Sequence, residues 1–335
     1  MRLAIESIQR QTYQNYEFLI VDDGSTEQKT IEILRSFHDP RIVIYQNKKN
    51  IGLTNSLIKG IELSRGAFIA RFDADDIALP HRLEKQVAYF LDHPEIGLLG
   101  SACFYIDGSG RFLGRQNVPE SDLEIRWHSL FANPFIHSSV MIRRSVLVNG
   151  NFNYDPECKT AQDYDFWVRL LPTVRASNLP QALIYYRIHD ASISSVLSEE
   201  QVDTHLRVAF NGLKQTFPTL DLDKGLLQSL ILEVANIRNL QSRKYWRTDL
   251  AILYLELWDI FKIEHLHNNS ISRLQKKIVY EVATMILYPP ITRGVLKVLL
   301  RITRIDVTWP LFFIKSVPGS ILGRVRTVFF RNRKS

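Results

Sequence analysis

The chain has 335 residues, of which 45% are hydrophobic and 23% are charged, and its formal net charge is +7. This is the composition of a globular protein with room for about two domains. The two cysteines, Cys103 and Cys158, are too few for a disulfide framework or a zinc cluster, and no uninterrupted apolar signal peptide follows Met1. A reducing, cytoplasmic location is therefore expected.

The positive charge is concentrated at the C-terminal end. Residues 286–335 hold ten Lys or Arg and one acid, Asp306, so this segment contributes +9 and the rest of the chain carries −2. This distribution excludes a generally cationic nucleic-acid binder, and no nucleic-acid partner is expected. It points instead to local contact with an acidic surface, such as an anionic membrane.

The first hundred residues alternate between short extended and helical patterns, which is typical of an α/β fold. The expected strands cover residues 17–21, 41–45, 67–72 and 96–100, and the expected helices cover 27–37, 53–64 and 80–91. Pro80 suits the first turn of the third helix.

Residues 101–195 are more irregular. They contain a hairpin signal at 107–110 and apolar strands at 140–142 and 182–186. A capping-box pattern at 198–201 opens a helical region, so we predict a boundary near 195–200.

Aspartates follow two of the apolar runs directly. Asp22 and Asp23 come after the strand at 17–21, and a cluster at 73–76 comes after the strand at 67–72. In an open α/β sheet, ligands lie beyond the carboxyl ends of the strands, so these acids are expected to share one ligand. Carboxylates at such an edge suit a divalent cation that carries phosphates.

Three other interpretations apply to the cluster at 73–76. An EF-hand loop would place Glu84 at position twelve, but it would place Ile77 and Ala78 where an oxygen ligand and a glycine are needed. For a phosphoaspartyl enzyme, nothing after these residues supplies an evident basic partner. A solvated turn that caps the following helix remains open, and Asp76 is expected to be that cap.

Several motifs occur together in one order and spacing. They are Val21-Asp22-Asp23-Gly24-Ser25-Thr26, Asn50-Ile51-Gly52 with Asn55, Gly66, Phe72-Asp73-Ala74-Asp75-Asp76, and the segments 80–86, 137–145, 163–167 and 186–189. With these motifs the chain resembles, over residues 1–195, family 2 glycosyltransferases, which are nucleotide-sugar-dependent enzymes of GT-A fold.

The resemblance implies a role for individual residues. Asp22, Asp23 and Asp73 would bind the nucleotide, and Asp75 together with Asp73 would bind Mg²⁺ or Mn²⁺. Asp163 would be the base that takes the proton from the acceptor hydroxyl in an inverting transfer.

The neighbouring positions are less regular. The family commonly has a glutamate before the catalytic acid, and this chain has Gln162. Arg187 and His189 occupy positions that approach the diphosphate or the metal. Asp163 has a second interpretation as a helix N-cap, and His137, Trp127 and Trp167 are expected to be structural.

The resemblance also implies an organisation. It predicts a GT-A, Rossmann-like mixed sheet flanked by helices in a catalytic domain at 1–195, with a nucleotide-binding half at 1–100 and an acceptor half at 101–195. Beyond the part that the resemblance covers, the residue pattern predicts an α-helical region at 196–285 and a basic amphipathic tail at 286–335. The family's first strand has no counterpart before residues 3–13, so we expect unpaired edges on the neighbouring strands and a longer native product.

The tail has the pattern of a cationic amphipathic helix. Arg293, Lys297, Arg301 and Arg304 recur on one helical face, and apolar residues occupy the other. This pattern favours peripheral attachment to an anionic membrane, and the alternative is packing against the rest of the protein.

The sequence therefore predicts a glycosyltransferase at the inner face of the cell membrane. It would move a sugar from a nucleotide donor, UDP-linked by expectation, to a saccharide or lipid-linked hydroxyl acceptor in glycan or surface polysaccharide synthesis. The alternative is a catalytically inactive, membrane-associated scaffold or binding protein that retains the GT-A fold.

Overall fold

The structure is a computed structural model. It describes residues 1–188, 198–219, 223–235, 237, 247–265, 267, 268, 270–286, 298, 301 and 302. The chain forms two compact units, Met1–Pro218 and Thr219–Ser335. The division falls after the helix that begins at the predicted boundary, because that helix packs within the first unit against α7.

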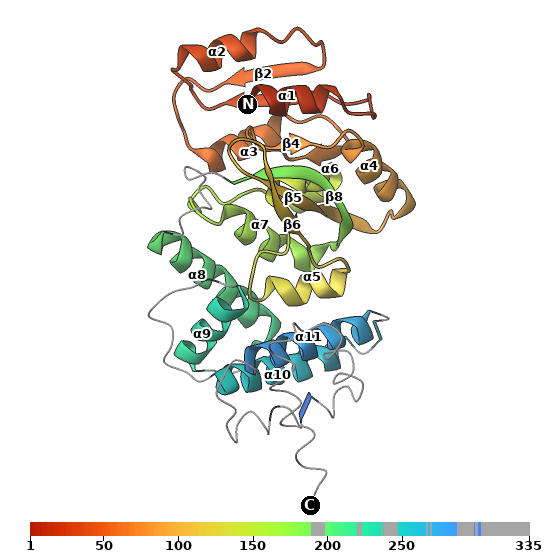
Figure 1. Cartoon of the computed structure of the whole chain (residues 1–335), viewed down its shortest axis with the longest axis vertical. Helices are drawn as coiled ribbons and strands as arrows, with labels where there is room; N and C mark the ends of the chain where they lie inside the picture. The colour runs from red at the N-terminus through yellow and green to blue at the C-terminus, as the bar shows by residue number, and fades with distance from the viewer. Residues whose placement is uncertain are drawn as a thin grey trace, which may run out of the picture. The chain divides into compact units, whose positions relative to one another are not determined.

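Two sheets organise the first unit (Figure 1). The smaller one consists of β1 and β2, which are parallel from the pair Phe18↔Ile42 to the pair Asp22↔Gln46. The elements of this part are α1 (Arg2–Gln9), β1 (Phe18–Asp22), α2 (Gln28–Arg35), β2 (Ile42–Gln46) and α3 (Leu53–Leu63). The apolar runs before Asp22 and after Arg41 thus form strands where the sequence predicts them.

The larger sheet has six strands in the order β3-β7-β5-β8-β4, with β6 paired to β5. Only β5 and β8 are parallel, so the sheet is mixed, as predicted. The strands are β3 (Phe68–Ala70), β4 (Ile77–Ala78), β5 (Ile96–Ile106), β6 (Phe112–Gln116), β7 (Met141–Arg143) and β8 (Arg175–Arg187).

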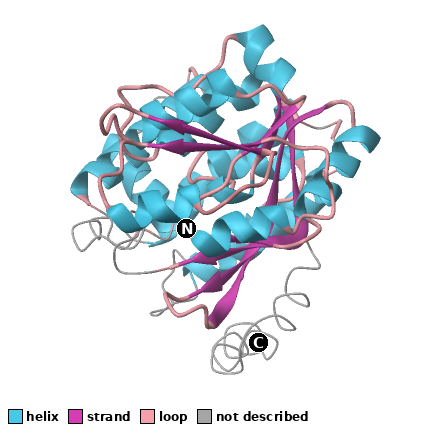
Figure 2. Ribbon diagram, turned by 90° about the horizontal axis from the view of Figure 1, so that it is seen from above, coloured by secondary structure: helices cyan, strands magenta, loops and turns pink. Residues whose placement is uncertain are grey.

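Helices flank these strands (Figure 2). They are α4 (Arg82–Asp92), α5 (Asp122–Ser129), α6 (Arg144–Gly150), α7 (Gln162–Leu170) and α8 (Glu199–Thr216). Phe166 and Trp167 of α7 pack with Leu98 and Val140 in one fully buried cluster. In a second cluster, Phe90 of α4 packs with Leu99 of β5 and Met141 of β7. Burial of these side chains from both element types fixes the sheet between its helices.

The two sheets are not joined by backbone pairing between β1 and β3. Within the described residues, β1 has β2 as its one strand neighbour, and β3 has β7. The side chains of Val43 and Ile44, on opposite faces of β2, are 43% and 41% exposed. Glu17, just before β1, accepts hydrogen bonds from the backbone and side chain of Arg65, just before β3. Side-chain contacts therefore join the two sheets where backbone pairing does not.

Most predicted elements are present, with shifted ends. The hairpin at 107–110 joins β5 to β6, and Ser198 and Gln201 form the predicted capping box of α8. Pro80 is not in the first turn of α4, because that helix begins at Arg82 with His81 as its N-cap. The carbonyl of Pro80 instead accepts a hydrogen bond from the backbone N–H of Thr12.

The second unit is helical. Its described helices are α9 (Lys224–Val234), α10 (Arg247–Glu264) and α11 (Ile271–Ile286). The side chains of Trp258 on α10 and Val282 on α11 are fully buried. A helical region is thus present where the residue pattern after Ser198 predicts one.

Little of the basic tail lies within the described residues. Val298 and Ile302 are buried, and Arg301 forms an ion pair with Asp259 of α10 at 2.6 Å. These three positions pack inside the second unit. The other residues of the predicted amphipathic pattern lie outside the described part of the chain. Among the helices that the structure describes, none combines the length and apolarity needed to cross a bilayer.

Candidate active site

The loop after β3 carries the acidic cluster. Arg71 and Asp73 form an ion pair within this loop. The backbone N–H of Arg71 donates to the carbonyl of Val140 at 2.9 Å, which continues the pairing of β3 with β7. The strand thus ends just before the carboxylates and presents them beyond the sheet.

A serine of the 137–139 turn organises this loop. The backbone N–H of Asp73 donates to the Ser138 hydroxyl at 3.0 Å, and the same hydroxyl lowers the pKa of Asp76. Both Ser138 and Asp76 are buried. One side chain therefore acts on both ends of the acidic loop.

The prediction that Asp76 caps the following helix is wrong. The N-cap of α4 is His81, and Asp76 instead accepts a hydrogen bond from the backbone N–H of Arg187 on β8 at 2.8 Å. Burial raises the pKa of Asp76 to about 7, and the charges of Asp73 and Asp75 act in the same direction. Its Oδ2 atom is buried without a hydrogen-bond partner. The short strand β4 begins at the next residue, so tertiary pairing, not helix capping, decides its position.

Arg187 holds the acidic loop from the outside. Its guanidinium donates to the carbonyl oxygens of Asp75 and Asp107, both at 2.9 Å, and to that of Gly108 at 3.2 Å. Arg187 therefore ties the loop to the β5–β6 hairpin. Its expected contact with a diphosphate or metal stays a prediction, and His189 lies outside the described residues.

Asp163 lies in the first turn of α7 and is not its N-cap, which is Ala161. Its carboxylate accepts a hydrogen bond from Asn133 Nδ2 at 2.6 Å. Burial raises the pKa of Asp163, and this outweighs the hydrogen bonds from Tyr164 N–H and Asn133 and the charge of Arg71. A carboxylate whose pKa is raised is a better proton acceptor, as a catalytic base requires.

Arg71 connects the two acidic regions electrostatically. The negative charges of Asp73 and Asp163 both raise the pKa of its buried guanidinium. The predicted base and the acidic loop thus act on one buried cation, which forms an ion pair with Asp73.

His137 is structural, as predicted. Its Nε2 lies 2.7 Å from the Tyr154 hydroxyl, and its ring contacts Trp167 edge-on. Burial lowers the pKa of His137 well below its usual value, so the imidazole is neutral. Trp167 is fully buried and Trp127 is 3% exposed, so both pack in the core and do not present a sugar-stacking face.

Asp22 and Asp23 lie at the carboxyl end of β1. Asp22 accepts from Gln46 Nε2 at 3.0 Å and from the backbone N–H of Ser25 at 3.1 Å. Asp23 accepts from Asn47 Nδ2 at 2.8 Å and from the backbone N–H groups of two loop residues, Ile51 and Gly52, at 2.9 Å each. Both carboxylates therefore fasten the loops around the β1 end, and their contact with a nucleotide stays a prediction.

Gly24 allows this arrangement. Its φ is +73°, and a Cβ atom there would lie 2.6 Å from the carbonyl carbon of Lys49. Only glycine fits both the left-handed backbone and the close approach of the 49–52 loop. The loop after β1 can thus pack directly on the loop after β2.

The acidic loop offers two carboxylates, those of Asp73 and Asp75, for the predicted metal. Among the described residues, no three His, Cys, Asp or Glu side chains gather as a ready-made metal cluster. Mg²⁺ is commonly held by one or two carboxylates together with substrate phosphates, and Asp73 and Asp75 match that smaller donor set. The residues therefore fit a metal that the donor's phosphates help to bind.

The sequence did not single out several residues that shape the site. Ser138, Asn133 and Tyr154 act through contacts with partners far away in the chain. Ser138 lies within a segment that carries the resemblance, which was the only available signal. Arg71 could have been noticed as the one cation beside the acidic loop.

Comparisons with known proteins agree with this architecture. The model of the family described as glycosyl transferase family 2 matches residues 1–149. An uncharacterised glycosyltransferase of Methanocaldococcus jannaschii is 35% identical over 193 residues, which cover 56% of this chain and 66% of that protein. Another, from Haemophilus influenzae, is 30% identical over 265 residues and covers 76% of this chain and 81% of its own length.

Two further proteins are similar. The O-antigen biosynthesis glycosyltransferase WbnJ of Escherichia coli is 32% identical over 201 residues, which cover 57% of this chain and 75% of the relative. The crystal structure of S. aureus TarS 1-349 in complex with UDP-GlcNAc superposes with a TM-score of 0.54 at 16% identity, over 92% of this chain and 87% of that one. That likeness concerns the fold. With the mixed sheet, the acidic loop and these relatives together, the chain belongs to glycosyl transferase family 2 and has the GT-A fold.

Proposed function

We propose that this glycosyltransferase moves a sugar, with inversion, from a UDP-linked donor to a hydroxyl acceptor during the assembly of a surface polysaccharide. The observation that carries the proposal is that buried Arg71 forms an ion pair with Asp73 and also interacts electrostatically with Asp163. This supports a candidate base close to a candidate diphosphate site, as a single displacement at the anomeric carbon requires. The TarS complex with UDP-GlcNAc and the O-antigen role in the name of the E. coli relative support the choice of donor and pathway.

Each residue has a defined part in this mechanism. Asp163 takes the proton of the acceptor hydroxyl as it attacks, and Asn133 fixes the direction of the accepting carboxylate. Asp22 and Asp23 form the nucleotide side, and Asp73 and Asp75 form the diphosphate side. Asp73 and Asp75 would hold a divalent cation, which would supply Lewis-acid stabilisation of the leaving diphosphate. Arg71 balances the charges of the acidic loop.

Peripheral attachment to the inner face of the membrane is part of the proposal. It rests on the sequence of residues 286–335, with ten basic residues and one acid. Arg301, the one basic residue of this segment that the structure describes, already pairs with Asp259. The membrane contact is therefore assigned to the other basic residues of the tail.

Sugar transfer from UDP-GlcNAc tests the proposal directly. Purified full-length protein is incubated with UDP-sugars and Mn²⁺, and released UDP is measured for the unsubstituted protein and for Asp163→Asn. Metal-dependent release that the substitution abolishes is the expected result. UDP binding without turnover of any donor would favour the scaffold alternative instead.

A further inference from the structure

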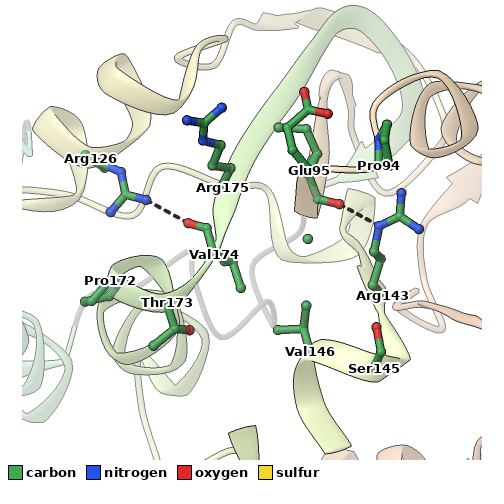
Figure 3. A pocket seen from close by; sticks show the side chains of 12 residues that line it. Pro94, Glu95, Arg126, Arg143, Ser145, Val146, Pro172, Thr173, Val174 and Arg175 are labelled. Atoms are coloured by element: carbon green, nitrogen blue, oxygen red, sulfur yellow. Dashed lines mark hydrogen bonds between the residues drawn. The ribbon is translucent and has the colours of Figure 1, made fainter. Parts of the chain in front are cut away.

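A cavity lies at the end of the larger sheet where β5 and β8 begin. It encloses about 500 Å³ next to the paired residues Ile96 and Arg175 (Figure 3). Arg187, which holds the acidic loop, is at the other end of β8. Arg175 and Arg187 are the first and last residues of β8, twelve positions apart, which is roughly 40 Å along an extended strand. The cavity is therefore distinct from the candidate active site.

The cavity combines an apolar floor with a basic rim. Val146 and Val174 lie over Gly97, where a Cβ atom would be 2.9 Å from a methyl carbon of Val146 and 3.2 Å from Val174. Arg126, Arg143 and Arg175 also line the cavity, and Figure 3 shows Arg143 on the opposite side from Arg126 and Arg175, with Glu95 between Arg143 and Arg175 in this view. Three cations beside an apolar surface favour a ligand with both an anionic and an apolar part.

Two of the three arginines are held in place by the protein. Arg126 donates to Asp122 at 2.8 Å and to the Val174 carbonyl at 2.7 Å. Arg143 donates to the Ile96 carbonyl at 2.8 Å. Its other hydrogen bonds also go to carbonyl oxygens, so no carboxylate of the described residues balances its charge. The rim is thus preorganised and carries a positive charge that is not neutralised.

Arg175 differs from the other two. Its side chain is exposed, and within the described chain it makes neither a hydrogen bond nor an ion pair. One acid, Glu95, also lines the cavity, and its carboxylate lies 3.5 Å from His93. Glu95 opposes an anionic ligand, so its effect on binding has the opposite sign to that of Arg175.

We propose that this cavity binds a phosphate ester, with the phosphate between Arg143 and Arg175 and the apolar part against Val146 and Val174. Arg175 can bind phosphate oxygens through paired N–H donors, whereas Arg143 can offer its Nη1, since its Nε and Nη2 donate to carbonyl oxygens. A phosphate monoester carries about −1.5 to −2 at neutral pH, which matches the two guanidinium charges without a carboxylate partner. The volume is within the range of about 300–1,000 Å³ of small-molecule sites. The proposal does not depend on the proposed function.

Calorimetric titration of the full chain with phenyl phosphate tests this site. The titration contains EDTA, so that no divalent cation at Asp73 and Asp75 contributes to binding. We expect Arg175→Gln to weaken binding about tenfold and Glu95→Gln to strengthen it about threefold, because one change removes an attractive charge and the other removes a repulsive one. Arg35→Gln on α2 is the matched control, since Arg35 is also exposed and unpaired among the described residues.

The opposite signs protect the test against simple misfolding, which would weaken binding in both variants. Competition by glucose 1-phosphate or by vesicles that contain phosphatidic acid then distinguishes a soluble ester from a lipid headgroup, and either result supports the site. The proposal is overturned if the unsubstituted protein does not bind phenyl phosphate, if Arg175→Gln binds it unchanged, or if Arg35→Gln weakens binding equally.

Discussion

The backbone N–H of Asp73 donates a hydrogen bond to the hydroxyl of Ser138, at 3.0 Å, across the boundary between the acidic loop and the 137–139 turn. The same hydroxyl lowers the pKa of Asp76, and Asp73 forms an ion pair with Arg71. The position of the predicted nucleotide and metal ligand is therefore set by a side chain 65 residues away.

Ser138→Ala should lower transfer activity by about 10- to 100-fold, because a small displacement of the acidic loop misplaces the diphosphate side of the site. The variant also leaves the Asp73 N–H without its partner, at a cost to stability of about 1–3 kcal/mol. Ser139→Ala is the control, since Ser139 is equally buried but bonds to Ser101 and Ile136. Urea unfolding and UDP release should separate the two variants; an equal loss of activity in both would show that Ser138 acts through stability alone.

Asp163→Asn should reduce kcat by about 10²–10⁴-fold while UDP affinity stays within about twofold, because the substitution removes only the proton acceptor. Asp165→Asn is a matched control on the same helix, since Asp165 pairs with Arg169 at 2.9 Å. Single-turnover kinetics and calorimetry provide the two measurements. Retained kcat in Asp163→Asn would assign the base to another residue.

The pH profile should follow the ionisation of Asp163. Burial raises the pKa of Asp163, so the base is protonated and inactive at low pH, and kcat rises as the pH increases through that raised pKa. The hydrogen bond from Asn133 lowers this pKa, so Asn133→Ala should move the acidic limb to higher pH. Rates measured from pH 4 to 8 give the comparison, and a limb that stays in place would contradict the coupling.

Removal of the divalent cation should weaken the binding of UDP to the protein. We expect EDTA and Asp75→Asn each to weaken UDP binding by at least about tenfold, because Mn²⁺ carries the attraction between carboxylates and phosphates. Asp107→Asn is a control acid in the adjacent hairpin, where its carboxylate binds Arg111. Calorimetry with and without Mn²⁺ distinguishes the cases; equal affinity in EDTA would mean that the site binds UDP without metal.

Gly24→Ala should destabilise the first unit more than Gly110→Ala. Both glycines have positive φ, +73° and +89°, so both substitutions strain the backbone by about 1–3 kcal/mol. Only at Gly24 would the new Cβ also meet backbone atoms, those of Lys49 and Asn50, whereas nothing lies within 4 Å at Gly110. Thermal unfolding measures the difference, and equal melting temperatures would mean that the 49–52 loop moves away freely.

The sequence was sufficient for elements whose signal is local. The apolar runs of β1 and β2 end at turn residues or acids, and the strands form there. It was insufficient for β5, which continues past residue 100 through a buried serine. Ser101 is satisfied there by Ser139, whose hydroxyl accepts from its N–H and donates to its carbonyl.

The same limitation applies to β8, predicted only over 182–186. The strand begins at Arg175 and contains the buried Asn178. Burial of this polar residue is tolerated because its amide group donates to the carbonyls of Pro119 and Pro134. In the site, aspartates next to strand ends were visible in the sequence. Their partners Ser138 and Asn133 were not, because contacts between distant segments leave no periodic pattern.

The division of the sheet has a mechanical consequence. No backbone ladder of the described residues connects β1 and β2 to the six strands that follow, and the Glu17–Arg65 pair that bridges them has an arginine side chain 78% exposed. Such an exposed pair is worth no more than about 1 kcal/mol. The aspartates at 22–23 and those at 73–75 thus follow strands of different sheets, which are joined by side-chain packing, such as that of Leu57, Ile58 and Ile61 of α3 against the core of the larger sheet. A nucleotide sugar that contacted both pairs of aspartates would link the two sheets, and its binding would raise the free energy of unfolding of the domain.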